Sequence, residues 1–272
     1  MSLVSTEWLD KNHSKVKIID SSWHMPNANR NAYEEYKKEH IKNAIFFDID
    51  KFSNKKTELP HMLPDEKEWE KIVSNLGITN EERIIVYDNS DVLSSCRCWY
   101  TFIFFRHKPN LISILDGGLS KWKKENRETT DKTLNHEKKN YKAKKISQLV
   151  KTKEEIDKNI SEKKFQVVDA RSKNRFLGLE KEPRPGIRRG SIKNSYCLPF
   201  GELINPEDKT FLEKNLIKEK FAKIGINKEN NVVFSCGSGI TAAVLSLAYS
   251  MINDKYLPKI YDGSWAEYGL IQ

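Results

Sequence analysis

The stretch with the clearest capacity for chemistry is CGSGI, residues 236–240, in which a cysteine precedes two glycines separated by a serine. Cys236 follows the apolar run VVFS, and the residues after the glycines, TAAVLSLAYSMI, have the apolar pattern of a helix. Glycines 237 and 239 allow a tight turn whose N–H groups point inward, toward the start of that helix. A thiol in such a turn is expected to ionise readily and act as a nucleophile. The alternative is a small buried residue that ends a strand.

Two kinds of chemistry use a cysteine in a loop of this size. Protein phosphatases place an arginine six residues after the nucleophile, where its guanidinium binds phosphate through two hydrogen bonds. Here that position is Ala242. The loop therefore favours a cysteine that carries sulfur as a persulfide.

The elements that would position this loop occur twice in the chain. The matching pairs are VKIIDSSW (16–23) with FQVVDARS (165–172), EHIKNAIFFDI (39–49) with GSIKNSYCLPF (190–200), EERIIVYD (81–88) with ENNVVFSC (229–236), and LISILDGGLSKW (111–122) with LPKIYDGSWAEY (257–268). The pairs keep their order, which indicates a duplication. In each half, short β-branched runs alternate with helical stretches, which predicts a small α/β domain with a parallel sheet and helices on both faces. Asp88 stands in the first copy where Cys236 stands in the second.

The boundary between the halves is expected in a lysine-rich stretch. Residues 123–145, KKENRETTDKTLNHEKKNYKAKK, are polar and have no apolar periodicity, as is typical of a surface linker. We predict a first domain over residues 1–128, a linker over 129–145 and a second domain over 146–272.

Composition excludes several classes of protein. The 272 residues are 38% hydrophobic and 31% charged, which is typical of a globular chain. The formal charge of +9 comes from lysines spread among nearly as many acids, so we expect an anionic substrate and no nucleic acid. The chain shows no leader and no apolar run of membrane length, which predicts a cytoplasmic protein with no membrane contact. Its four cysteines form no C-x-x-C pair, so neither a metal nor a disulfide framework is expected.

Motifs along nearly the whole chain resemble the rhodanese superfamily, and within it the two-domain 3-mercaptopyruvate sulfurtransferases. The stretches that carry the resemblance are YEEYKKEHIKNAIFFDID, LPHMLP, VYDNS, LDGGLSKW, VVDARSKNRFLGLEKEPRPGI, LPFGEL, SCGSGITAA and YDGSWAEYG. The resemblance implies two tandem rhodanese-like α/β domains, of which only the second is catalytic.

The residues after the cysteine bear on the sulfur donor. Members that prefer thiosulfate resemble Cys-Arg-Lys-Gly in this loop, whereas members that prefer 3-mercaptopyruvate resemble the Cys-Gly-Ser-Gly found here. A neutral Gly237-Ser238 pair attracts doubly charged thiosulfate less than Arg-Lys would. We therefore expect 3-mercaptopyruvate to be the donor, with thiosulfate as the alternative.

The resemblance also implies roles for residues outside the loop. Arg175 and Arg184 would bind the carboxylate of a 2-oxo acid, for which a planar guanidinium suits better than an ammonium. Ser238, His61 and Asp50 would form a relay that protonates the departing enolate. Asp48 lies two residues before Asp50 and is the competing choice. The family's His-Ile-Pro-Gly-Ala pattern reads HIKNA and SIKNS here, which leaves the place of the Asp50 loop open.

The expected cycle needs no cofactor. Backbone amides of Gly237, Gly239, Ile240 and Thr241 would stabilise the thiolate and persulfide anions. The sulfur would pass to a thiol acceptor, such as thioredoxin, or to cyanide. The alternative interpretation is that Cys236 belongs to a non-enzymatic sulfur carrier or protein-docking module, which hands its persulfide only to a partner protein. Two further thiols, Cys96 and Cys98, are expected to be packing or incidental thiols, with a redox or resolving role as the alternative.

Overall fold

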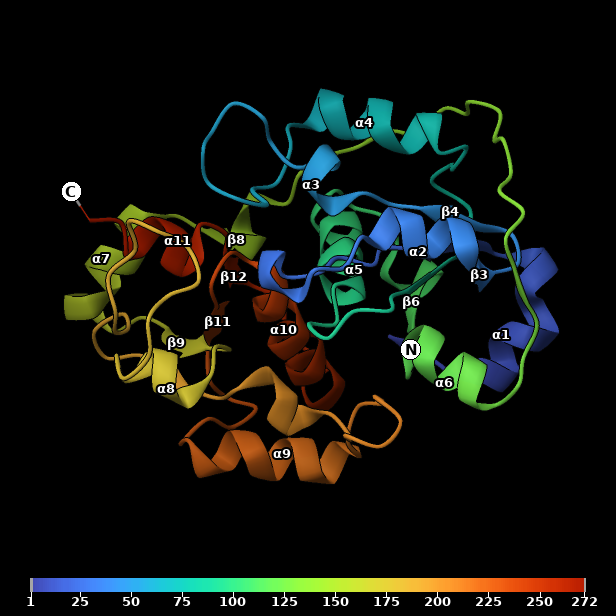
Figure 1. Cartoon of the computed structure of the whole chain (residues 1–272). Coiled ribbons are helices and arrows are strands. Elements are labelled where there is room, and N and C mark those ends of the chain that lie inside the picture. The colour runs from blue at the N-terminus through green and yellow to red at the C-terminus, as the bar shows by residue number, and fades with distance from the viewer. Residues whose placement is uncertain (1, 272) are drawn as a thin grey trace. The chain divides into compact units, whose positions relative to one another are not determined.

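The computed structural model describes residues 2–271, which fall into two compact units (Figure 1). The first unit contains residues 2–54, 63–146 and 206–210, and the second contains residues 55–62, 147–205 and 211–271. Two short segments thus belong to the unit formed mainly by the other half of the chain.

The first unit is built on a five-stranded parallel sheet. Its strand order is β1-β6-β5-β2-β4, and the strands are β1 (Leu3–Val4), β6 (Ile112–Leu115), β5 (Ile84–Tyr87), β2 (Lys17–Asp20) and β4 (Ala44–Phe46). A separate antiparallel pair joins β3 (His40–Ile41) to β7 (Thr129–Thr130).

The second unit repeats this sheet. Its order is β8-β12-β11-β9-β10, formed by β8 (Val150–Lys151), β12 (Ile260–Tyr261), β11 (Val232–Ser235), β9 (Gln166–Asp169) and β10 (Tyr196–Cys197), again all parallel. Four of the five strands have counterparts within the duplicated stretches at the same place in the order, and β1 and β8, which lie outside those stretches, also occupy the same place. The predicted fold of two α/β domains with parallel sheets is confirmed.

The register of the two sheets is also the same. Asp20 pairs with Tyr87 at the ends of β2 and β5, and Asp169 pairs with Ser235 at the ends of β9 and β11. The next residues along β5 and β11 are Asp88 and Cys236. Both therefore lie at the carboxyl edge of a parallel sheet, where ligands bind in open α/β folds.

Helices connect the strands in both units. The helices of the first are α1 (Thr6–Asn12), α2 (Ala32–Lys38), α3 (Ile49–Phe52), α4 (Glu66–Asn75), α5 (Ser95–Phe104) and α6 (Gly118–Lys124). Those of the second are α7 (Lys153–Glu162), α8 (Lys173–Phe176), α9 (Lys214–Lys223), α10 (Ile240–Ile252) and α11 (Ser264–Tyr268). Short 3-10 turns lie at His13–Lys15, Pro26–Ala28, Pro109–Leu111, Ser147–Leu149 and Phe200–Leu203.

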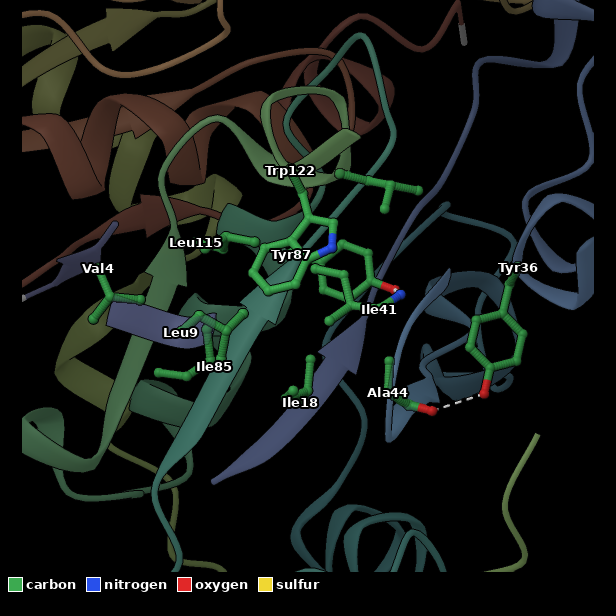
Figure 2. Packing of buried hydrophobic residues seen from close by; sticks show 11 residues of the cluster. Val4, Leu9, Ile18, Tyr36, Ile41, Ala44, Ile85, Tyr87, Leu115 and Trp122 are labelled. Atoms are coloured by element: carbon green, nitrogen blue, oxygen red, sulfur yellow. Dashed lines mark hydrogen bonds between the residues drawn. The ribbon is translucent and has the colours of Figure 1, made fainter. Parts of the chain in front are cut away.

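The core of the first unit packs helices onto the sheet. Ile18 and Ile85 of the strands belong to one buried cluster with Leu9 of α1 and Trp122 of α6 (Figure 2). The hydroxyl of Tyr36 donates to the carbonyl of Ala44 at 2.8 Å, as the dashed line in Figure 2 shows. This bond satisfies the polar end of a large aromatic ring inside the core.

The second unit has apolar side chains on both faces of its sheet. Val233 packs in one cluster with Ile156 of α7 and Trp265 of α11. Its neighbour Phe234 contacts instead the rings of Phe221 in α9 and Tyr249 in α10. Successive strand residues point to opposite faces, so α7 and α11 cover one side and α9 and α10 the other (Figure 1).

The predicted linker packs on the first unit. Tyr141 is 1% exposed, and its backbone N–H donates to Ser74 Oγ at 3.1 Å. The domain limits drawn from the sequence stay a prediction.

Within residues 2–271, no helix combines the length and the apolar character that crossing a membrane requires.

Candidate active site

The cysteine loop joins the central strand of the second sheet to its longest helix. Strand β11 ends at Ser235, Gly239 has φ 80° and α10 begins at Ile240. A left-handed φ of this kind suits glycine, since other residues are strained there. Cys236 lies at the start of this turn and is 2% exposed.

Hydrogen bonds to α11 fix the orientation of the loop. The N–H groups of Trp265 and Ala266 donate to the carbonyls of Cys236 and Gly237 at 2.9 and 2.8 Å. In a trans peptide the N–H points opposite to the carbonyl, so the amides of Gly237 and Ser238 face away from α11. Within residues 2–271 these two amides donate to no protein group. They are therefore available to an anion beside the thiol.

Ser264 supports the cysteine from the adjacent turn. Its Oγ accepts the N–H of Cys236 at 3.1 Å and donates to the carbonyl of Tyr261 at 2.8 Å. Ser264 is fully buried and has φ 50°. This residue was not expected from the sequence, although the repeat contains a signal: Gly118 of DGGL in the first copy corresponds to Ser264 of DGSW.

Ser238 and His61 are in direct contact. His61 Nδ1 and Ser238 Oγ are hydrogen-bonded at 2.9 Å. Both residues are buried, His61 being 5% exposed and Ser238 6%. His61 comes from the segment 55–62, which belongs to the second unit. Burial keeps this pair from exchanging its hydrogen bond with bulk water.

Asp50 lies in the first unit, on the short helix α3. Its carboxylate accepts the indole N–H of Trp23 at 2.8 Å. The competing residue, Asp48, caps this helix by accepting the N–H of Lys51 at 2.9 Å. Each of the two carboxylates thus has a partner within the first unit, and the choice of Asp50 over Asp48 stays a prediction.

Arg175 extends from α8 to the cysteine loop. A Cβ added to Gly237 would lie 3.2 Å from Arg175 Nη2, so the guanidinium is next to the loop backbone. Arg175 Nη2 also donates to Glu182 Oε2 at 2.5 Å. The second predicted arginine, Arg184, is half-buried in the loop that follows Glu182.

A buried chain of charges supports Arg175. Arg171 binds Asp169 through Nε and Nη2, with the shortest contact at 2.7 Å, and its Nη1 donates to Glu182 Oε1 at 2.6 Å. The side chains of Arg171, Asp169 and Glu182 are 1%, 2% and 4% exposed. Neither Arg171 nor Glu182 was expected from the sequence to take part in the site.

The other cysteines are held as thiols. Burial, followed by the charge of Asp88, raises the pKa of Cys96, and burial also raises the pKa of Cys98. Burial raises the pKa of Cys197 to about 11. These three residues therefore offer little thiolate at neutral pH. Residues 2–271 contain no group of three or more His, Cys, Asp or Glu side chains arranged to hold a metal ion.

Comparison with known proteins adds independent findings. The rhodanese-like domain family matches residues 5–125 and 152–270. The chain is 36% identical to thiosulfate/3-mercaptopyruvate sulfurtransferase 1, mitochondrial, of Arabidopsis thaliana, over 98% of this chain and 75% of that protein. It is 35% identical to 3-mercaptopyruvate sulfurtransferase of Mus musculus, over 98% and 91%.

A solved structure agrees with these relatives. SseA from Escherichia coli, described as a 3-mercaptopyruvate sulfotransferase, superposes with a TM-score of 0.87 at 29% identity. The superposition covers 97% of this chain and 99% of SseA.

Proposed function

The chain belongs to the rhodanese family, and we propose that it is a 3-mercaptopyruvate sulfurtransferase whose Cys236 carries the transferred sulfur as a persulfide. The observation that carries this proposal is the loop at residues 236–239. Cys236 lies at the carboxyl edge of the sheet, beside two unengaged amides, in a loop that contains no cationic side chain. Such a loop stabilises a thiolate and a persulfide without favouring a doubly charged donor.

The first half-reaction transfers sulfur to the enzyme. The Cys236 thiolate attacks the sulfur of 3-mercaptopyruvate, an S–S bond forms, and the C–S bond breaks with its electron pair moving to carbon. The product is the enolate of pyruvate, which takes one proton to become pyruvate. The persulfide remains on Cys236 with its outer sulfur open to attack.

Ser238 and His61 would supply this proton. Their 2.9 Å hydrogen bond allows the serine hydroxyl to donate to the enolate and to regain a proton from the imidazole. Asp50 is proposed as the third member, orienting His61. Its assignment rests on the resemblance of the FFDID motif to the family.

Two arginines would hold the substrate carboxylate. Arg175 is next to Gly237 and so within reach of a donor bound at the cysteine. Arg184 is the second proposed ligand, again by resemblance of the EPRPG motif. The amides of Gly237, Gly239, Ile240 and Thr241 would then stabilise the sulfur anion.

The second half-reaction returns the enzyme to its starting state. A thiolate acceptor, or cyanide, attacks the outer persulfide sulfur and releases Cys236 as a thiolate. Thioredoxin is a suitable acceptor because its own chemistry exposes a low-pKa thiol.

A cytoplasmic location is also part of the proposal, although the Arabidopsis relative is named as mitochondrial.

Steady-state kinetics with the two donors test the assignment. We expect a kcat/KM for 3-mercaptopyruvate that exceeds the value for thiosulfate, and no turnover of either donor by Cys236→Ser. Thiosulfate is the second candidate because the name of the Arabidopsis relative includes it. A higher kcat/KM for thiosulfate would reverse the donor preference, and turnover by Cys236→Ser would overturn the site.

A further inference from the structure

The guanidinium of Arg175 is only partly used by the protein. Its Nε and Nη2 donate to Glu182 Oε1 and Oε2 at 3.4 and 2.5 Å, which occupies one edge of the planar group. A guanidinium has five N–H donors, so one N–H on Nη2 and two on Nη1 remain. The remaining Nη1–Nη2 edge presents two parallel N–H groups, the arrangement that binds a carboxylate with two hydrogen bonds.

Glu182 is itself held in place. Its Oε1 accepts from Arg171 Nη1 at 2.6 Å, and its side chain is 4% exposed. Arg171 in turn is bound by both oxygens of Asp169 and by the carbonyl of Gly190 at 2.8 Å. Because each partner is buried and engaged on two sides, the Glu182 carboxylate has one orientation and gives Arg175 one orientation.

One end of the free edge of Arg175, the Nη2 atom, lies at the cysteine loop. Nη2, which belongs to both edges, is 3.2 Å from the position that a Cβ on Gly237 would occupy. The side chain of Arg175 is 18% exposed, so a ligand can reach it. The lack of a Cβ at residue 237 leaves the space that the guanidinium uses.

We propose that Glu182 is a positioning residue, which turns Arg175 so that its free two-donor edge receives the carboxylate of the sulfur donor beside Cys236. The proposal rests on the proposed function, in which Arg175 binds that carboxylate. The proposal predicts that loss of the Glu182 charge weakens binding of the carboxylate, whereas electrostatic attraction alone would predict stronger binding. Removing the negative charge of Glu182 raises the local positive potential, yet it releases Arg175 from the orientation that binds the carboxylate.

Two alkylating probes separate these effects at Cys236. Iodoacetate and iodoacetamide react alike: the thiolate attacks the methylene carbon, a C–S bond forms and iodide leaves. They differ in that only iodoacetate has a carboxylate. The ratio of their rate constants at Cys236 cancels the intrinsic reactivity of the thiol and reports on carboxylate binding. Mass spectrometry of the Cys236 peptide measures both rates.

The variant to test is Glu182→Gln, which keeps the size of the side chain and removes its charge. We expect the iodoacetate to iodoacetamide ratio to fall about fivefold or more, toward the ratio in Arg175→Ala, and the KM for 3-mercaptopyruvate to rise. An unchanged or increased ratio overturns the proposal. So does an unchanged ratio in Arg175→Ala, since Arg175 would then not bind the carboxylate.

Two further variants control for folding and for general charge effects. Glu162→Gln removes an acid paired with Lys164 at 3.0 Å on the surface of the same unit, and it should leave the ratio unchanged. An equal fall in this variant overturns the proposal. Gly237→Ala adds a Cβ that displaces Arg175 Nη2 and leaves the Arg171–Asp169 and Arg171–Glu182 pairs in place. It should lower the ratio even if Glu182→Gln does not fold, and an unchanged ratio there overturns the proposal.

The readout is independent of sulfur transfer. If the wild-type protein does not turn over 3-mercaptopyruvate but the ratio responds to Glu182→Gln, the proposed function fails and the positioning of Arg175 stands. If turnover is observed and the ratio does not respond, the reverse holds.

Discussion

Asp88 occupies in the first sheet the position that Cys236 occupies in the second. Each follows the last residue of the middle strand, and each carbonyl accepts the N–H of a helical residue, Leu119 at 3.0 Å and Trp265 at 2.9 Å. The side chains differ in what surrounds them. The carboxylate of Asp88 accepts the N–H groups of Ser90 and Ser95 at 2.9 and 2.8 Å. In the first unit, these loop N–H groups therefore already bind a carboxylate of the protein itself.

This relationship predicts that a thiol alone does not create a second active site. In a Cys236→Ser background, Asp88→Cys should gain no sulfur from 3-mercaptopyruvate. The connection to the next helix is longer, since α5 begins at Ser95, and Ser22 stands where the second unit has Arg171. Intact-protein mass spectrometry checks the expectation, and a persulfide on residue 88 would contradict it.

The relay makes a prediction that depends on the donor. Ser238→Ala and His61→Asn should each lower kcat with 3-mercaptopyruvate by a factor of about 10² or more, within the usual range of general acid catalysis. Cleavage of thiosulfate expels sulfite, which needs no proton, so its rate should change much less. Stopped-flow measurement of persulfide formation with both donors tests this. An equal loss for the two donors would indicate a structural role for the pair.

Asp20 gives the folded protein a pH dependence. Burial raises the pKa of Asp20 from 3.8 to about 6, although hydrogen bonds from Ser22 oppose the shift. The folded state then binds this proton more tightly than the unfolded state, so the stabilising contribution is complete at low pH and is lost as pH rises through 6. The rise corresponds to about 3 kcal/mol. Asp20→Asn should therefore stabilise the protein at pH 8 and have little effect near pH 4, as measured by urea unfolding.

The equivalent residue of the second unit should behave in the opposite way. Asp169 lies at the same strand end but is paired with Arg171 at 2.7 Å in a buried ion pair. Asp169→Asn leaves a buried guanidinium with less compensation, and should destabilise the protein by about 3–5 kcal/mol at both pH values. Similar responses of the two variants would contradict this account of the two strand ends.

Residue 237 should govern the choice of donor. Gly237→Arg adds a positive charge at the loop, which attracts thiosulfate, and its Cβ would lie 3.2 Å from Arg175 Nη2, which disturbs carboxylate binding. We expect the ratio of kcat/KM for thiosulfate to that for 3-mercaptopyruvate to rise at least about tenfold. A matched Gly201→Arg variant, at a glycine with open space around it, should leave the ratio unchanged. A ratio unaffected by the change at residue 237 would show that the loop does not discriminate between the donors.

Much of the fold could be predicted because the duplication repeats it. Matched stretches around Asp20 and Asp169 place the same strand twice, and the observed strand orders agree. The residues that make up each unit could not be predicted from their order in the chain. The segment 55–62 carries His61 into the second unit, and packing of Tyr141 places part of the lysine-rich stretch on the first. Such exchanges depend on tertiary contacts that leave no local pattern.

Site residues that lie within a recognised motif could be predicted from the sequence. Residues that act through another side chain were harder to predict. Cys236, Ser238 and His61 were expected, and the structure places the last two in contact. Glu182 was missed because an acid among the charged residues of LEKEPR is ordinarily a surface residue. Its role follows only from burial and from its two arginine partners.

The most direct test of the central claim is mass spectrometry of the intact wild-type protein after brief exposure to 3-mercaptopyruvate without an acceptor. The account predicts a gain of one sulfur atom, localised to Cys236 by peptide analysis and removed by a thiol or cyanide. An unchanged mass, or added sulfur on Cys96, Cys98 or Cys197, would contradict it.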